Sequence, residues 1–215
     1  LLEENPVVST KGLRLPESDS REFRALTDRE FDRFRQVCPA WLLPPLLAAA
    51  LLGLRNEEVR TLEWADVDLH AEVIRIRNKD GFELKSQGHT GIREFKMDIP
   101  RALHAVLAEL HKGKNEYKDD LVFHNSLGRK FSKDALRRAF AHVMKACEIS
   151  DITQVHALRK TFITHMAKRE KNIFLLQELA RHRNIQTTRR YVNVFADEKK
   201  RAMGGFDIGQ RAQAS

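Results

Sequence analysis

One segment near the end of this sequence combines residue types that could do chemistry on an anion. Residues 181–194, RHRNIQTTRRYVNV, place Tyr191, one of only two tyrosines, among basic and polar neighbours. A tyrosine that serves only the core usually has apolar neighbours, so Tyr191 is a candidate nucleophile. His182, nine residues earlier, could donate a hydrogen bond or carry a proton. Taken alone, however, the segment is explained more simply by a tyrosine packed in the core.

A second candidate is HALR, from His156 to Arg159. Residues three apart on a helix share a face, so these two side chains would project together while Leu158 turns toward the core. An arginine offers a planar fork to a phosphate, and a histidine adds a further donor. A solvated charged face remains the commoner explanation of this spacing alone.

Two further cations stand at positions from which they could reach an anion. Arg55 directly follows a long apolar stretch, so we expect it to be partly buried and to need a partner, for which Glu58 is in reach. A purely structural ion pair is the alternative. Lys85 lies near the tip of a predicted hairpin, where a flexible amine could reach into a groove. Lys79 and Lys96 flank the same hairpin, and Lys79 is the second choice.

Composition and missing motifs exclude several kinds of protein. The chain has 215 residues, a net charge of +8 and a pI near 9.7, which favours polyanionic partners weakly. It contains no HExxH, CxxC, P-loop, GxGxxG or GxSxG motif, so we expect no metal and no nucleotide cofactor. Two cysteines, Cys38 and Cys147, fit a reducing compartment. The longest apolar run, residues 42–54, contains two prolines and is too short to cross a bilayer.

The hydrophobic pattern predicts a mainly helical α+β domain with a small antiparallel sheet of two or three strands. Alternation over residues 73–78 and 93–100 predicts the strands. Apolar spacing predicts helices over residues 28–37, 46–54 and 101–110, one following residue 55, and more over 133–147, 156–169, 173–182 and 185–195. Thr27 with Glu30, Ser132 and Asn172 are expected to cap three of these helices.

The sequence divides into three parts by composition. Residues 1–24 have proline, glycine, serine and threonine but little periodicity, as in a linker. Residues 25–195 carry all the candidate residues and would form one domain. Residues 196–215 would form a tail, which either folds back on this domain or docks on a neighbouring subunit. Because the chain lacks an initiating methionine, we interpret it as part of a longer protein.

Together, the separate motifs resemble those of the tyrosine recombinases, the phage integrase family. The similarity runs from about residue 26 to residue 194 and is carried by LLGLRNEEVRTLEWADVDL, HALRKTFITHMA and LARHRNIQTTRRYVNV. The order of the candidate residues is also that of the family: Arg55, Lys85, His156, Arg159, His182 and Tyr191. Several separated motifs in the same order make the resemblance specific.

The resemblance implies the family's catalytic-domain fold and a site-specific recombinase that cleaves and rejoins DNA. Tyr191 would attack a phosphate to give a 3′-phosphotyrosine ester, while Arg55 and Arg159 hold its oxygens. His182 would add a hydrogen bond, His156 would assist proton transfer near neutral pH, and Lys85 would protonate the leaving oxygen. Neighbouring Arg and His would lower the pKa of Tyr191 from its usual ~10. His156 could instead be mainly structural.

The resemblance also implies the partners and the setting of the protein. Double-stranded DNA would be bound by a homotetramer, with an accessory DNA-bending protein as a further partner, in the cytoplasm at the nucleoid. No cofactor and no membrane association are implied. A DNA-binding regulator that does not cleave, and a type IB topoisomerase, are the alternative functions.

DNA contacts outside the catalytic residues are expected from one helix and one turn. Residues 133–146 resemble the family helix that lies in the major groove, with Lys133, Arg137 and Lys145 on its outer face. Arg181 stands where the family usually has glycine before the histidine, and we expect it to contact phosphate or to crowd the turn. Lys160, where histidine is frequent in the family, is a mild departure.

Overall fold

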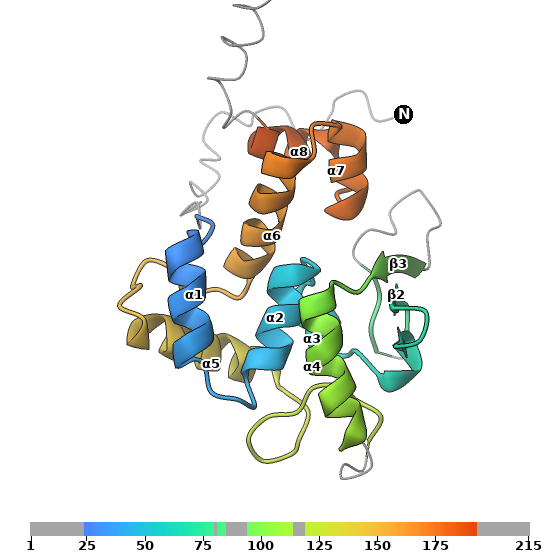
Figure 1. Ribbon diagram of the computed structural model, residues 1–215, viewed down its shortest axis with the longest axis vertical. Coiled ribbons are helices and arrows are strands. Elements are labelled where there is room, and N and C mark those ends of the chain that lie inside the picture. The colour runs from blue at the N-terminus through green and yellow to red at the C-terminus, as the bar shows by residue number, and fades with distance from the viewer. Residues whose placement is uncertain (1–23, 80, 85–93, 114–118, 193–215) are drawn as a thin grey trace, which may run out of the picture.

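The computed structural model of the chain describes residues 24–79, 81–84, 94–113 and 119–192. Helices dominate it, and one small sheet lies at one side (Figure 1). The predicted fold class, mainly helical with a small antiparallel sheet, is confirmed. The predicted linker up to residue 23, the tail 196–215 and Lys85 lie outside the described residues.

The first two helices follow from local signals. Helix α1, Asp28–Val37, begins with the predicted capping box, in which the Thr27 side chain accepts from the Glu30 backbone and the Glu30 carboxylate accepts in return. Helix α2, Leu43–Leu51, begins three residues before the predicted start. Its first turn contains two prolines, and proline is tolerated there because the first backbone N–H groups of a helix have no partner within it.

The helix after α2 is shorter than predicted. Helix α3, Asn56–Arg60, has five residues, and a 3-10 turn, η1, Trp64–Asp66, follows it. Between them the chain turns to pair with a distant segment: Trp64 donates to Asp120 and Val122 donates to Leu62, both at 2.9 Å. These long-range bonds end the helix at a point that local periodicity does not reveal.

The sheet has the strand order β1-β2-β3 and is antiparallel throughout. Strands β2, Val73–Arg77, and β3, Glu94–Asp98, are the two predicted from alternation, and Val73 lies opposite Asp98. Ile74 and Ile76 point into the core while the residues between them are half-exposed. The third strand, β1, Val67–Asp68, comes from a segment in which no strand was predicted.

Five helices form the rest of the described chain: α4, Arg101–Lys112; α5, Lys133–Ala146; α6, His156–Arg169; α7, Ile173–Leu179; and α8, Ile185–Val192. Ser132 caps α5 by accepting from the Ala135 backbone at 3.1 Å. Asn172 caps α7 through two backbone N–H groups. Both caps were predicted.

The described residues form two hydrophobic cores, and helix α6 contributes to both. The large core joins α1 to α5 with the sheet and includes Leu158 at the start of α6. The small core lies among α6, α7 and α8, which form the upper part of Figure 1. Phe162 and Met166 pack on the small core and are only half-buried, so the apolar residues of α6 are divided between two cores. Within the described parts of the chain, no helix is long and apolar enough to span a membrane.

Candidate active site

Glu58 is the buried carboxylate around which the candidate site is organised. Its side chain is 2% exposed and accepts from Arg55 Nη1 at 2.9 Å and from Arg181 Nη1 at 2.8 Å. Burial opposes ionisation of Glu58, but the charges of Arg181 and Arg55 outweigh it and lower its pKa. The predicted Arg55–Glu58 pair is therefore present, and 24% of the Arg55 side chain stays exposed.

Arg159 lies deeper, at the start of α6, with 2% of its surface exposed. Its two Nη groups donate to the backbone carbonyls of Gly53 and Ala180. Burial and the charges of Arg181 and Arg55 lower its pKa to about 9, so the guanidinium is still charged at neutral pH. A guanidinium has five N–H donors, and the two carbonyls account for two of them, so the group keeps donors for an anion.

Arg55, Glu58, Arg159 and Arg181 together form what we call the site cluster. Arg55 and Arg181 contact Glu58, and Arg159 shares the Gly53 carbonyl with Arg181, so three guanidinium groups accompany one carboxylate and the cluster carries an excess of two positive charges. Buried charges are normally paired, because leaving one unpaired away from water is costly. An unbalanced cluster of cations is therefore suited to binding a phosphate, which brings the missing negative charge.

His182 and Tyr191 lie side by side next to this cluster. Their ring centroids are 6.0 Å apart, with 28° between the ring planes. His182 Nδ1 is 3.0 Å from the hydroxyl of Thr188, which is fully buried one turn before Tyr191 on α8. A Thr188 hydroxyl that donates to Nδ1 leaves the ring proton on Nε2, free to donate to a substrate oxygen.

Both candidate histidines are neutral at neutral pH. Burial, with the charges of Arg159 and Arg55, lowers the pKa of His182 to about 4. Burial of the ring, with Arg159, Lys160 and Arg55, likewise lowers the pKa of His156 to about 4. His156 is exposed as a residue, so solvent screens part of this effect. The pKa of His156 thus lies below the near-neutral value expected from the sequence, because the ring is partly desolvated beside Arg159 and Lys160.

The pKa of Tyr191 also differs from the expectation. Half-burial against the small core raises it, and the positive charges of Arg159 and Arg190 only partly oppose that effect. The expected lowering is wrong for this structure because desolvation of the phenolate outweighs the nearby cations. Tyr191 is therefore protonated, and its proton must be removed by a base when it reacts.

The lysine candidates have different outcomes. Lys85 lies outside the described residues. Lys79, the second choice, is bound: its ammonium contacts Asp66, lies 3.1 Å from Glu63 and donates to the Thr61 carbonyl at 2.6 Å. An ammonium engaged by two carboxylates and a carbonyl is not positioned to serve as a free acid, which argues against Lys79.

Arg181 does not lie on the DNA-facing surface expected from the sequence. Its side chain is 2% exposed, and its guanidinium donates to Glu58 and, at 2.9 Å, to the Gly53 carbonyl. Arg181 thus lies inside the protein with both Nη groups engaged, and not at the surface where a DNA contact was expected. On α5, by contrast, Lys133 and Lys145 are exposed and Arg137 is half-exposed beside Asp134.

With this geometry, comparison with known proteins becomes informative. A profile of the phage integrase family matches residues 26–198. The chain belongs to the phage integrase family. It is 29% identical to tyrosine recombinase XerC of Rhodospirillum centenum over 145 residues, which are 67% of this chain and 40% of that protein. It is 25% identical to tyrosine recombinase XerC of Chlamydia trachomatis over 213 residues, 93% of this chain and 62% of that protein.

The fold of this integrase-family chain is also found in solved structures. The Tn1549 transposon integrase in complex with a circular intermediate DNA superposes with a TM-score of 0.74 at 20% identity, covering 88% of this chain and 68% of that one. The chain spans between two fifths and about three fifths of the length of the XerC relatives named above. The similarity therefore establishes the family and the fold of this part.

Two residues that matter in this integrase-family site were missed in the sequence. Gly53 has φ +60, and a Cβ there would lie 2.5 Å from the Phe162 ring. Its carbonyl accepts from both Arg159 and Arg181, so the backbone must keep this conformation. A glycine ending an apolar helix could have signalled the turn. Thr188, three residues before Tyr191, shares its helical face and could have been found by that spacing.

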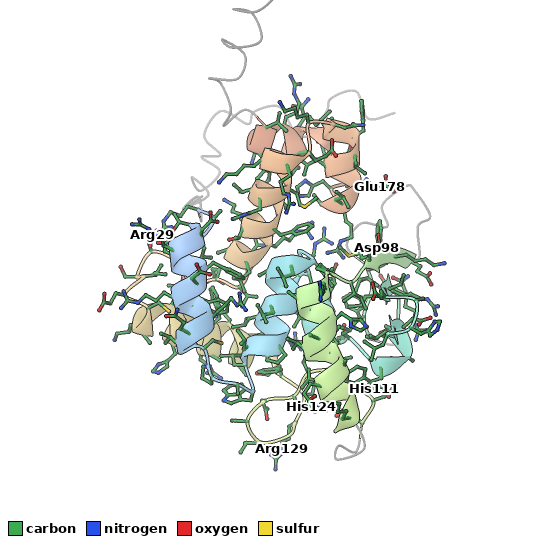
Figure 2. The ribbon with its side chains drawn as sticks, in the orientation of Figure 1. Arg29, Asp98, His111, His124, Arg129 and Glu178 are labelled. Carbon is green, nitrogen blue, oxygen red and sulfur yellow. The ribbon has the colours of Figure 1, made fainter. Side chains whose placement is uncertain are left out.

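A cavity in the described part of the chain is lined by no member of the site cluster. It measures about 830 Å³ and lies between α2, β3, α6 and α7. Figure 2 labels two carboxylates that line it, Glu178 on α7 and Asp98 at the end of β3. The rest of the lining is mostly apolar and includes none of the predicted catalytic residues that the structure describes. The site cluster, and not this cavity, is therefore the candidate site for a reaction.

In the described ranges no group of histidine, cysteine, aspartate and glutamate could hold a metal ion.

Proposed function

We propose that this chain cleaves and rejoins DNA strands at specific sites through a 3′-phosphotyrosyl intermediate on Tyr191. One observation carries the proposal: the Tyr191 ring lies 6.0 Å from His182, beside a cluster of buried arginines. A nucleophile next to unpaired positive charge is suited to attack on a phosphodiester.

The proposed reaction exchanges one ester for another. The Tyr191 oxygen attacks phosphorus, the bond from phosphorus to the 5′ oxygen breaks, and the phenolic proton passes to a base. The 5′ oxygen takes a proton from an acid and leaves as a hydroxyl. Attack by that hydroxyl, or by one from another strand, reverses the steps. The ester stores the bond energy, so rejoining needs no nucleotide cofactor.

The arginines are proposed to stabilise the negative charge that develops on the phosphate. Arg55 and Arg159 would donate their remaining N–H groups to the non-bridging oxygens, in a partly desolvated site where such bonds are strong. Their positions are set in advance by Glu58 and by backbone carbonyls, so little reorganisation is needed during the reaction.

The histidines would contribute as neutral groups. His182 would donate from Nε2 to a phosphate oxygen, since its Nδ1 is occupied by Thr188. His156, whose pKa is lowered to about 4, would accept the phenolic proton rather than supply one. Lys85 is proposed as the acid for the leaving 5′ oxygen, a role that Lys79 cannot take while it is bound by Asp66 and Glu63.

The proposed substrate is duplex DNA. Lys133, Arg137 and Lys145 on α5 would bind its backbone, so affinity should fall steeply with salt. We further propose a homotetramer on DNA, an accessory DNA-bending protein and a location at the nucleoid. Sedimentation of the protein with and without its DNA site tests the assembly.

Tyr191→Phe tests the proposed nucleophile. The substrate is a nicked suicide duplex built on whatever inverted repeats sequencing of the DNA beside the gene identifies. The wild-type protein should become covalently joined to the DNA, while the Tyr191→Phe variant should bind with the same affinity and form no adduct. Covalent product from Tyr191→Phe would show that another residue is the nucleophile.

The alternative functions predict different results with a supercoiled plasmid, without metal or nucleotide. A regulator that only binds DNA leaves the plasmid supercoiled, and this result would contradict strand cleavage. A topoisomerase relaxes plasmids regardless of sequence, whereas the proposed recombinase acts only on plasmids that carry the repeats.

A further inference from the structure

Arg181 occupies a backbone position that an arginine rarely adopts. Helix α7 ends at Leu179, and Arg181 follows with φ +50. The Arg181 N–H donates to Glu178 at 2.8 Å and the His182 N–H donates to Gln177 at 3.0 Å. This bonding pattern ends many helices, and its left-handed residue is usually glycine. A side chain here strains the backbone, so its contacts must offset that cost.

The Arg181 guanidinium contacts the same acceptors that hold the two proposed phosphate-binding arginines. It donates to Glu58, which also binds Arg55, and to the Gly53 carbonyl, which also binds Arg159. Its Nε is buried without a hydrogen-bond partner among the described residues. An unsatisfied buried donor is uncommon, and here the fold accepts it while keeping both Nη contacts.

The backbone of the same turn completes the arrangement. The Arg181 carbonyl accepts from Arg55 Nη2 at 3.4 Å, and the preceding carbonyl, Ala180, accepts from Arg159. His182 follows directly, and Gln177 of α7 donates to its carbonyl at 2.9 Å. One turn therefore contacts both arginines and carries the histidine that lies against Tyr191.

We propose that Arg181 is a positioning residue: it clamps Glu58 and the Gly53 carbonyl to the α7 turn, so that Arg55, Arg159 and His182 keep their relative positions before DNA arrives. This inference rests on the proposed strand-transfer function. The clamp joins segments more than 120 residues apart, since Arg181 and Glu58 are separated by 123 positions. Preorganised donors speed a reaction because they need not be aligned in the transition state.

The test compares Arg181→Gly, which relieves the backbone strain, with Arg181→Lys, which keeps a charge but loses the fork. Arg33→Gln is the matched control, because Arg33 forms an exposed ion pair with Glu148 at 3.1 Å. The readouts are the single-turnover cleavage rate at saturating suicide DNA and the dissociation constant for that DNA at two salt concentrations.

If Arg181 positions the site, its replacement should lower the cleavage rate without weakening DNA binding. Cleavage by both Arg181 variants should fall about tenfold or more, while the DNA dissociation constant stays within about threefold and its salt dependence is unchanged. Millimolar methylguanidinium should restore part of the rate of Arg181→Gly but not that of Arg181→Lys. Arg33→Gln should cleave like the wild type.

Two results would overturn the inference. A wild-type cleavage rate in Arg181→Gly would mean that the residue only ends the helix. Weaker DNA binding with a shallower salt dependence would mean that Arg181 contacts phosphate directly, as the sequence suggested.

A separate measurement keeps the inference testable if the wild-type protein forms no adduct and the proposed function fails. Urea unfolding of Glu58→Gln, Arg181→Gly and the double variant measures their coupling. A clamp predicts that the double variant lowers the midpoint by less than the sum of the single variants. Additive shifts would show that Arg181 does not hold Glu58, whatever the protein's activity.

Discussion

Among the residues that the structure describes, two charged clusters bury a carboxylate among cations, and they differ in whether their charges balance. Beside the sheet, Asp66 is 1% exposed and is bound by Arg77 and Lys79, while Glu63 lies against the same lysine. This group, which we call the sheet-side cluster, has two carboxylates and two cations. The site cluster has one carboxylate for three guanidinium groups.

The difference indicates what each cluster does. The sheet-side cluster is satisfied by its own members and joins η1 to β2 and the turn after it, which is a structural task. The site cluster has guanidinium N–H groups without an acceptor and an excess of positive charge. A folded protein tolerates such a group where a bound anion supplies the missing negative charge. Charge balance, rather than the number of ion pairs, thus distinguishes the sheet-side cluster from the cluster proposed to bind phosphate.

The sharpest test of this contrast removes one cation from each cluster. Arg159→Ala should lower the cleavage rate per folded molecule by about 10³-fold or more, since it deletes donors to the developing phosphate charge. Lys79→Ala should leave that rate within about threefold and lower only stability. Single-turnover cleavage, corrected for the folded fraction, measures both. A comparable loss in Lys79→Ala would place the sheet-side cluster in the reaction and restore Lys79 as an acid.

Removing the carboxylates should affect stability unequally. Glu58→Gln leaves Arg55 and Arg181 without their anion and should lower the free energy of unfolding by about 3–5 kcal/mol. Asp66→Asn should cost about 1–3 kcal/mol, because Lys79 keeps Glu63 and the Arg77 side chain is 42% exposed. Urea unfolding at constant salt gives both values. Equal losses would mean that the excess positive charge of the site cluster does not lower the free energy of unfolding.

Local signals in the sequence predicted those parts of the fold that depend on local chemistry. The caps at Thr27, Ser132 and Asn172 and the alternation of β2 and β3 need only neighbouring residues, and all are present. The early end of α3 was missed because pairing with the distant residues 120–122 decides it, whereas β1 was missed because its two residues are too few to show an alternating pattern. The same limit applies to α6, whose apolar residues are divided between two cores.

The site shows the same division. Residue type and order singled out Arg55, Arg159, His182 and Tyr191, because their chemistry is visible without a structure. The burial of Arg181 was not visible, since its partner Glu58 lies 123 positions away. The lowered pKa of His156 was not foreseen and the lowering expected for Tyr191 was wrong, because desolvation depends on packing that a sequence does not state.

The pH dependence of stability should distinguish the neutral histidines of the site from acids elsewhere. The folded pKa of His182 and of His156 is about 4, below the value of 6.5 for the unfolded chain. In that window the unfolded state binds more protons, so stability is fully present above pH 6.5 and falls as the pH drops toward 4.

The double variant His156→Asn/His182→Asn should reduce the dependence of the free energy of unfolding on pH, measured by urea unfolding between pH 4 and 6.5. Glu30→Gln is the control, because the pKa of Glu30 is lowered from 4.5 to about 2 by Arg24, and its contribution is lost only below pH 4.5. A slope that survives in the double histidine variant would show that it comes from other groups, and that burial beside the arginines does not hold these rings neutral.

The smallest expected effect concerns the single hydroxyl that orients His182 beside the site cluster. Thr188→Val keeps the shape of a buried side chain but removes the contact to Nδ1. The loss should be about 1 kcal/mol in stability and up to about tenfold in cleavage rate, with unchanged DNA affinity. The neighbouring exposed threonine, Thr187→Val, is the matched control and should change neither. Equal behaviour of the two variants would mean that the site cluster, and not Thr188, sets the orientation of His182. A selective loss in Thr188→Val would instead extend the preorganised site onto the helix that carries Tyr191.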